Sequence, residues 1–110
     1  MEKKLRPVTV LGKVKLMIAE GSWLEVSCLE STAKIGTVMR GEWSFDVITP
    51  LDGTEVHKSQ VVTWRTLEQK TISTIVGLTA LAIDLGIHLP EVPLFEGEVG
   101  VWKAKTTADS

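Results

Sequence analysis

Apolar and polar residues alternate along the first half of the chain, which is the pattern of strands with one buried face. Between residues 8 and 18, nearly every second position is apolar, and Lys13 and Lys15 lie between them. We therefore predict a first strand over 8–18, with an apolar face made of Val8, Val10, Val14, Leu16 and Ile18. A second strand follows, with Leu24, Val26 and Cys28 on its apolar face. An odd-length link over 20–22 keeps both faces on one side, because a one-residue slip turns every side chain over.

The same alternation predicts a second hairpin, closed by a three-residue loop at Arg40-Gly41-Glu42. This loop sets three residue pairs opposite one another: Met39 with Trp43, Thr37 with Phe45, and Ile35 with Val47. A turn is predicted at 50–53, because Pro50 fixes φ and Gly53 tolerates a positive φ.

Two further strands are predicted in the second half of the chain. One covers 55–64; its polar first half lies in solvent, and Val62 and Trp64 return to the core. The other is the short segment 97–105. The proline-punctuated stretch 88–95 between the helix and the last strand is expected to be extended.

A single long helix is predicted from Thr66 to about Leu85. Thr66 and Gln69 match a capping box, and Gly86 is a typical stop. The apolar positions cover most of the helix circumference, about twice the stripe of roughly 100° that one sheet can bury. The helix must therefore be covered on two sides. The second cover is the chain's own Leu89–Phe95 segment, another subunit or a bound apolar ligand.

These elements predict an α+β fold. It consists of a curved antiparallel β-meander of five or six strands, barrel-like if the curvature is strong, packed against one long apolar helix, with a short C-terminal strand. The 110 residues suit one domain, which we assign to 1–105, with a frayed tail over 106–110. The content of 44% apolar and 24% charged residues is that of an ordinary globular protein.

Charge and cysteine content argue against several partner classes and locations. A net charge of −2 provides no large cationic surface for nucleic acid. The longest uncharged run, 71–83, is shorter than the roughly 20 residues that cross a bilayer, so no membrane partner is expected. We see no signal peptide at the basic start of the sequence. A lone cysteine, Cys28, suits a reducing compartment, and we expect a cytoplasmic protein.

Few residues could support catalysis. His57 lies in a polar strand segment, His88 follows the helix stop, and Cys28 is assigned to a buried face. A buried cysteine usually behaves as a small hydrophobe. No phosphate-binding glycine loop is present. The carboxylates of Glu42, Asp46, Asp52 and Glu55 cluster around two turns, where we expect solvation and turn roles rather than divalent-metal binding. We therefore expect no enzyme, no cofactor and no metal.

The sequence favours a non-enzymatic binding or assembly module that forms a homo-oligomer, most simply a homodimer. Leu81 or Leu85 is expected to lie against the second chain. The first alternative is a carrier of a small apolar or aromatic ligand in a pocket bounded by Trp43, Phe45, Ile75 and Leu78. The second alternative is a small-barrel nucleic-acid binder that uses the basic first strand. The candidate binding residues are Trp43, Phe45, Ile75, Leu78, Leu81 and Leu85.

Overall fold

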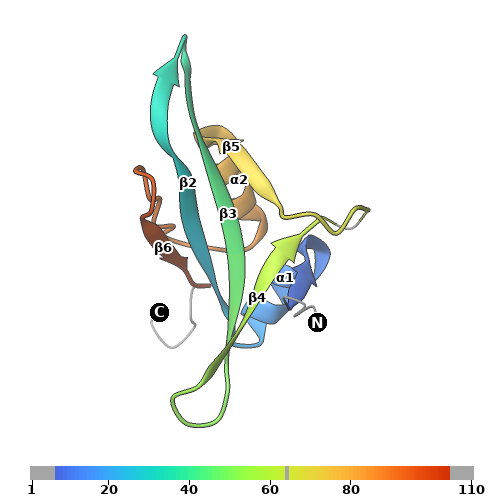
Figure 1. Cartoon of the computed structure of the whole chain (residues 1–110). Coiled ribbons are helices and arrows are strands. Elements are labelled where there is room, and N and C mark those ends of the chain that lie inside the picture. Colours follow the sequence, from blue (N-terminus) through green and yellow to red (C-terminus); the bar gives the residue numbers. More distant parts are fainter. Residues whose placement is uncertain (1–6, 64, 105–110) are drawn as a thin grey trace, which may run out of the picture.

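The chain folds into two layers, a six-stranded sheet and two helices that pack on one of its faces (Figure 1). The computed structural model describes residues 7–63 and 65–104. The elements in chain order are β1 (Val8–Val10), α1 (Leu11–Ala19), β2 (Trp23–Ile35), β3 (Val38–Pro50), β4 (Val56–Val62), β5 (Thr71–Thr74), α2 (Ile75–Asp84) and β6 (Val99–Trp102). The predicted α+β class is confirmed.

The sheet is open rather than closed into a barrel. Its strand order is β1-β4-β3-β2-β6, and only the β1–β4 pair is parallel. β3 is the central strand and pairs with β2 along one edge. Its other edge is shared, because β4 pairs with residues 46–50 and β5 pairs with residues 40–44.

The predicted first strand over 8–18 is wrong beyond Val10, because residues 11–19 form α1. Val14 and Ile18 are buried at the i, i+4 spacing of a helix face, whereas Leu16 is 62% exposed. Positions 14 and 18 fit both periods, so alternation alone could not separate strand from helix. The predicted pairing of this segment with 24–28 therefore does not exist. Lys13 and Lys15, on which the nucleic-acid alternative rested, are exposed on α1.

The second predicted hairpin is wrong, because most of the two segments that it set opposite one another, 35–39 and 43–47, lies in the single strand β3. The chain reverses at Gly36-Thr37, and residues 40–42 lie inside β3. Gly36 has φ +66°, which suits the first central position of a two-residue hairpin turn. The observed register places Cys28 opposite Trp43, Val26 opposite Phe45 and Leu24 opposite Val47.

The fifth strand is confirmed, but the turn before it lies over 51–55, because Pro50 is the last residue of β3 and pairs with Val56. Gly53 has φ +76° in the loop between β3 and β4. The beginning of β4 is exposed as predicted, and Val61 and Val62 are buried. The polar half also contributes one buried contact, since the Ser59 and Thr9 hydroxyls lie 2.7 Å apart. The prediction for Trp64 falls outside the described residues.

The single long helix over 66–85 is also wrong, because α2 begins only at Ile75. Residues 71–74, three of which are β-branched, pair with β3 as β5. The N-cap of α2 is Thr74, whose hydroxyl accepts a hydrogen bond from the Gly77 backbone N–H at 3.0 Å. The predicted stop is confirmed, since Gly86 has φ +77° directly after the helix.

The core lies between the helices and the inner face of the sheet. The strands contribute the apolar faces predicted for 24–28 and 43–47, together with Trp102 and Val61. The two helices contribute Val14, Ile18, Leu78 and Ala82. The Phe45 and Trp102 rings lie 6.1 Å apart in a tilted arrangement at the centre of this layer.

Candidate functional site

The six candidate residues belong to, or pack against, the chain's own core. Trp43, Phe45 and Leu78 are each at most 1% exposed, and Leu85 is 6% exposed. Ile75 and Leu81 are half-buried and pack against the same cluster. These side chains fill the space between α2 and the sheet, where the carrier alternative placed its ligand. The structure thus brings the predicted residues together, but as packing partners.

Two buried indoles hold the segment that follows α2. The Trp43 Nε1–H donates to the Pro93 carbonyl oxygen at 2.7 Å, and the Trp102 Nε1–H donates to the Glu91 carbonyl oxygen at 2.6 Å. Pro93 is buried, and Val92 packs against the core. Residues 91–93 therefore cover part of the core in cis, whereas the sequence analysis expected Leu89–Phe95 as one of three possible covers for the second side of the helix.

This cover in cis is incomplete. The side chains of Leu89, Leu94 and Phe95 are 81%, 44% and 63% exposed. The segment therefore contributes its backbone and Val92 to the fold, while its larger apolar side chains lie in solvent.

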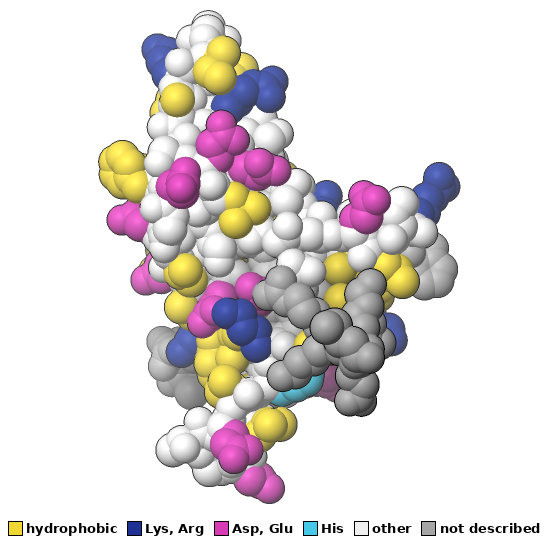
Figure 2. All heavy atoms as spheres, viewed as in Figure 1, with side chains coloured by type: hydrophobic (Ala, Val, Ile, Leu, Met, Phe, Trp, Pro, Cys, Tyr) yellow, Lys and Arg dark blue, Asp and Glu magenta, His cyan; other side chains and the backbone are white. Residues whose placement is uncertain are grey.

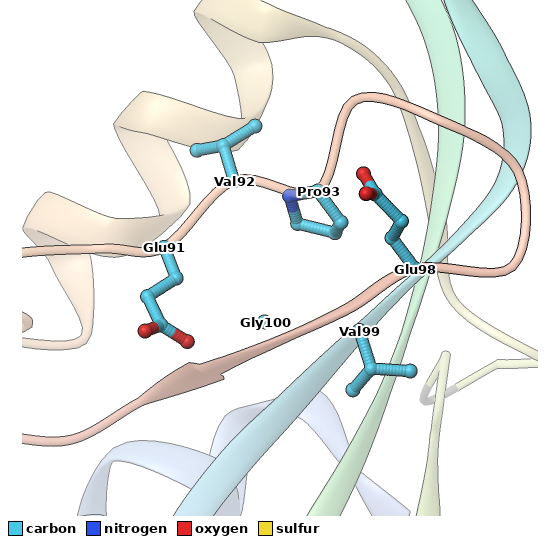
Figure 3. A pocket seen from close by; sticks show the side chains of 6 residues that line it. All are labelled: Glu91, Val92, Pro93, Glu98, Val99 and Gly100. Carbon is cyan, nitrogen blue, oxygen red and sulfur yellow. The ribbon is translucent and has the colours of Figure 1, made fainter.

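A shallow hollow of about 420 Å³ lies between this segment and the start of β6 (Figure 3). Glu91 and Glu98 stand at its two ends, and Gly100 of β6 also lines it. Both carboxylates already serve the backbone, because Glu91 Oε1 accepts from Val101 N–H at 2.7 Å and Glu98 Oε1 accepts from Phe95 N–H at 3.2 Å. Within residues 7–63 and 65–104, no group of three or more His, Cys, Asp and Glu side chains could hold a metal ion. The two carboxylates at the hollow therefore already have backbone partners within the chain.

The one cysteine and the two histidines lie in different environments. His57 and His88 are exposed, whereas Cys28 is 2% exposed and its thiol donates to the Glu30 carbonyl oxygen at 3.2 Å. Burial, reinforced by the nearby Glu98 and Glu96 carboxylates, raises the pKa of the Cys28 thiol above its usual value. Cys28 therefore stays a neutral thiol near neutral pH.

Native Cys28 is expected to react with a disulfide reagent far more slowly than the cysteine of the urea-unfolded chain at pH 8. The reactive species is the thiolate, and the folded chain disfavours and shields it. Because the pKa of Cys28 is raised in the folded chain, its buried neutral thiol also makes folding stability depend on pH. The stability that the neutral thiol contributes is complete below the pKa of the unfolded chain and is lost as pH rises through the pKa of the folded chain. Thiol release followed by absorbance tests this, and equal rates in the two states would contradict it.

Three of the four tryptophans fall within the described residues, and two of these are core residues. Trp43 and Trp102 are fully buried, whereas Trp23 is half-buried on the opposite face of the sheet. The Lys103 ammonium lies 5.3 Å from the Trp23 ring centroid, a cation–π distance. Core packing thus accounts for two of the three described tryptophans.

The outer face of α2 is the largest departure from the predicted site. Val76 and Ile83 are 78% and 71% exposed, although both belong to the apolar arc that the sequence shows. Thr79 and Ala80 lie between them and are also exposed. The sequence therefore predicted an apolar helix here, and only the structure shows which of its apolar residues remain uncovered.

No family model, curated protein or solved structure matched the chain. Among the helices of the described residues, none has the length and apolar character needed to cross a membrane.

Proposed function

We propose that this chain is a non-enzymatic assembly module whose copies associate through the outer face of α2. The observation that carries this proposal is the exposure of Val76 and Ile83 on a helix whose opposite face is buried. Residues seven apart point in nearly the same direction on a helix, so these side chains form one apolar stripe. Contiguous exposed apolar surface is typical of interaction sites.

The stripe is suited to a two-fold contact with a second copy. Val76 and Ile83 are equally distant from the midpoint between Thr79 and Ala80. An antiparallel second α2 would therefore place each Val76 against the Ile83 of the other copy. The small Thr79 and Ala80 side chains would meet at the crossing point, where helices approach to about 8–10 Å. Such an interface uses the same surface on both chains and closes as a dimer.

The helix alone is a small interface. α2 has 10 residues, and a helix of that length spans only about 15 Å. Stable interfaces bury roughly 800 Å² on each partner. Neighbouring apolar residues must therefore contribute, and Leu89, which follows the helix and is 81% exposed, is the nearest in sequence.

The substitution Ile83→Lys is expected to remove this contact while the chain stays folded. Each buried isoleucine contributes about 1.5–3 kcal/mol, and a two-fold interface uses the position twice, so the loss is about 3–6 kcal/mol. Sedimentation equilibrium should show a lower mass for the variant than for the wild type. Circular dichroism should show an unchanged fold, because Ile83 makes little contact within its own chain.

Two further substitutions serve as comparisons for Ile83→Lys. Leu51→Lys changes an exposed apolar residue in the β3–β4 loop and should leave the assembly intact. Leu85→Lys should unfold the chain rather than dissociate it, because Leu85 is packed in its own core rather than available to a second chain. A wild type that sediments as a 12.0 kDa monomer at all concentrations would overturn the proposal.

A further inference from the structure

The β2–β3 hairpin extends beyond the rest of the molecule (Figure 1). Along β2, the last residue with a backbone hydrogen bond to a segment outside the hairpin is Thr32, whose N–H donates to the Leu94 carbonyl oxygen at 2.8 Å. Along β3, the residue nearest the tip that pairs with another strand is Arg40, which lies opposite Thr74 of β5. In the described parts of the chain, residues 33–39 have no backbone partner outside the hairpin. We call residues 33–40 the arm.

The arm is apolar and positively charged. Ile35 and Met39 are 61% and 43% exposed, and the only charged residues of the arm are Lys34 and Arg40. An isolated two-stranded hairpin is marginally stable in water. An exposed arm of this composition is therefore expected to gain stability from a partner surface.

The second feature lies beside the base of the arm and carries the opposite charge. Residues 94–99, which we call the ridge, follow the outer edge of β2, where Cys28 N–H donates to the Glu98 carbonyl oxygen and Gly97 N–H donates to the Cys28 carbonyl oxygen, both at 2.9 Å. Leu94, Phe95 and Val99 are exposed on the ridge, and its charged residues are Glu96 and Glu98. Figure 2 shows basic side chains at the tip of the hairpin and acidic side chains below it.

We propose that the arm of one copy docks on the ridge of a second copy, and that the second copy returns the same contact. The ridge occupies the outer edge of β2 as far as Thr32 and leaves that edge open over 33–35, so the two features form a step. When two copies lie with their arms antiparallel, the arm of each copy lies beside the ridge of the other. Lys34 and Arg40 of each copy then lie near Glu96 and Glu98 of the other, and the exposed apolar side chains of arm and ridge are covered.

This contact deepens the proposed function and rests on it, since it names a second surface through which copies associate. A chain with two different two-fold contacts is expected to assemble beyond a dimer, most simply into a tetramer with two kinds of interface. The two contacts should differ in their response to salt. The α2 stripe has no charged residue, whereas the arm and ridge attract each other through charges that salt screens.

The test uses the Ile83→Lys chain, in which only the arm–ridge contact should remain. Sedimentation equilibrium should show a dimer of twice 12.0 kDa. Its dissociation constant should rise about tenfold as ionic strength rises from about 0.05 M to about 0.5 M. In the same background, Lys34→Glu combined with Arg40→Glu should weaken the dimer at least about tenfold, because both arms then repel the ridges.

Mixing two variants provides the decisive experiment. One carries Lys34→Glu and Arg40→Glu, the other carries Glu96→Lys, and both carry Ile83→Lys. Each alone should associate weakly, whereas the mixture should form a heterodimer, because its unaltered arm faces an unaltered ridge and its reversed arm faces the reversed ridge. As a control, Lys13→Glu combined with Lys15→Glu makes the same charge change as the arm substitutions, at exposed positions of α1, and should leave association unchanged.

The outcomes separate this inference from the proposed function. One outcome is that Ile83→Lys converts the wild type directly to a monomer and that the arm and ridge substitutions have no effect. This outcome overturns the arm–ridge contact and leaves the α2 contact standing. A mixture that associates no better than its components also overturns the arm–ridge contact. A dimer that remains in the Ile83→Lys chain and responds to the charge reversals supports it.

Discussion

Replacing Trp43 with alanine is expected to lower the free energy of unfolding by about 3–5 kcal/mol, the usual range for removing a large buried aromatic side chain. Trp43 is completely buried at the centre of the inner sheet face. Its indole also holds residues 91–93 through the 2.7 Å hydrogen bond to the Pro93 carbonyl oxygen. The substitution therefore leaves a cavity and an unsatisfied buried carbonyl group, and urea unfolding measures both effects together.

The variant Trp43→Phe separates the two effects. Phenylalanine keeps most of the apolar volume but lacks the N–H, so this variant should lose about 1–3 kcal/mol from the unsatisfied carbonyl. Trp23→Phe is the matched control, because Trp23 is half-buried and its cation–π contact with Lys103 is worth about 0.5–1 kcal/mol. If Trp43→Phe is as stable as the wild type, the indole does not hold the segment.

Gly100→Ala is also expected to lower the free energy of unfolding. A Cβ built at Gly100 lies 2.6 Å from the Glu91 carbonyl oxygen and 3.0 Å from the Glu91 Cβ. The nearer atom belongs to the backbone, so the added methyl must push residue 91 away from β6. We expect a loss of about 1–3 kcal/mol from overpacking, together with a weaker bond from the Trp102 Nε1–H to Glu91.

Thermal denaturation measures the loss of stability, and hydrogen exchange of the Trp102 indole N–H measures the displaced segment. Gly12→Ala is the control, because a Cβ at Gly12 meets nothing within 4 Å and the residue lies in α1. It should be neutral or stabilise the chain by up to about 1 kcal/mol, since alanine favours helix over glycine. Normal indole protection in Gly100→Ala would show that the segment accommodates the methyl group.

The two indoles and Gly100 relate the fold to the proposed assembly surfaces. Trp43, Trp102 and Gly100 position residues 91–93, and the ridge follows directly in the chain. Substitutions that release this segment should therefore also disturb the arm–ridge contact. The α2 stripe lies on another element and should be less affected.

Sequence alone determined which residues of the central strands face the core. The inner positions of 24–28 and 43–47 were predicted correctly although the pairing partners of both segments were wrong, because side-chain alternation depends on position within a strand and not on its partner. Gly53 and Gly86 were also predicted correctly, since a positive φ is a local requirement that glycine meets without strain.

Tertiary structure decided what local patterns left ambiguous. Val14 and Ile18 suit a strand or a helix equally, and only packing against the sheet shows that Leu16 turns to solvent. Residues 71–74 could extend a helix, but the free edge of β3 draws them into the sheet. The number of covered sides of α2 was open for the same reason. Val76 and Ile83 remain exposed, and exposure depends on where distant segments lie, which no local pattern records.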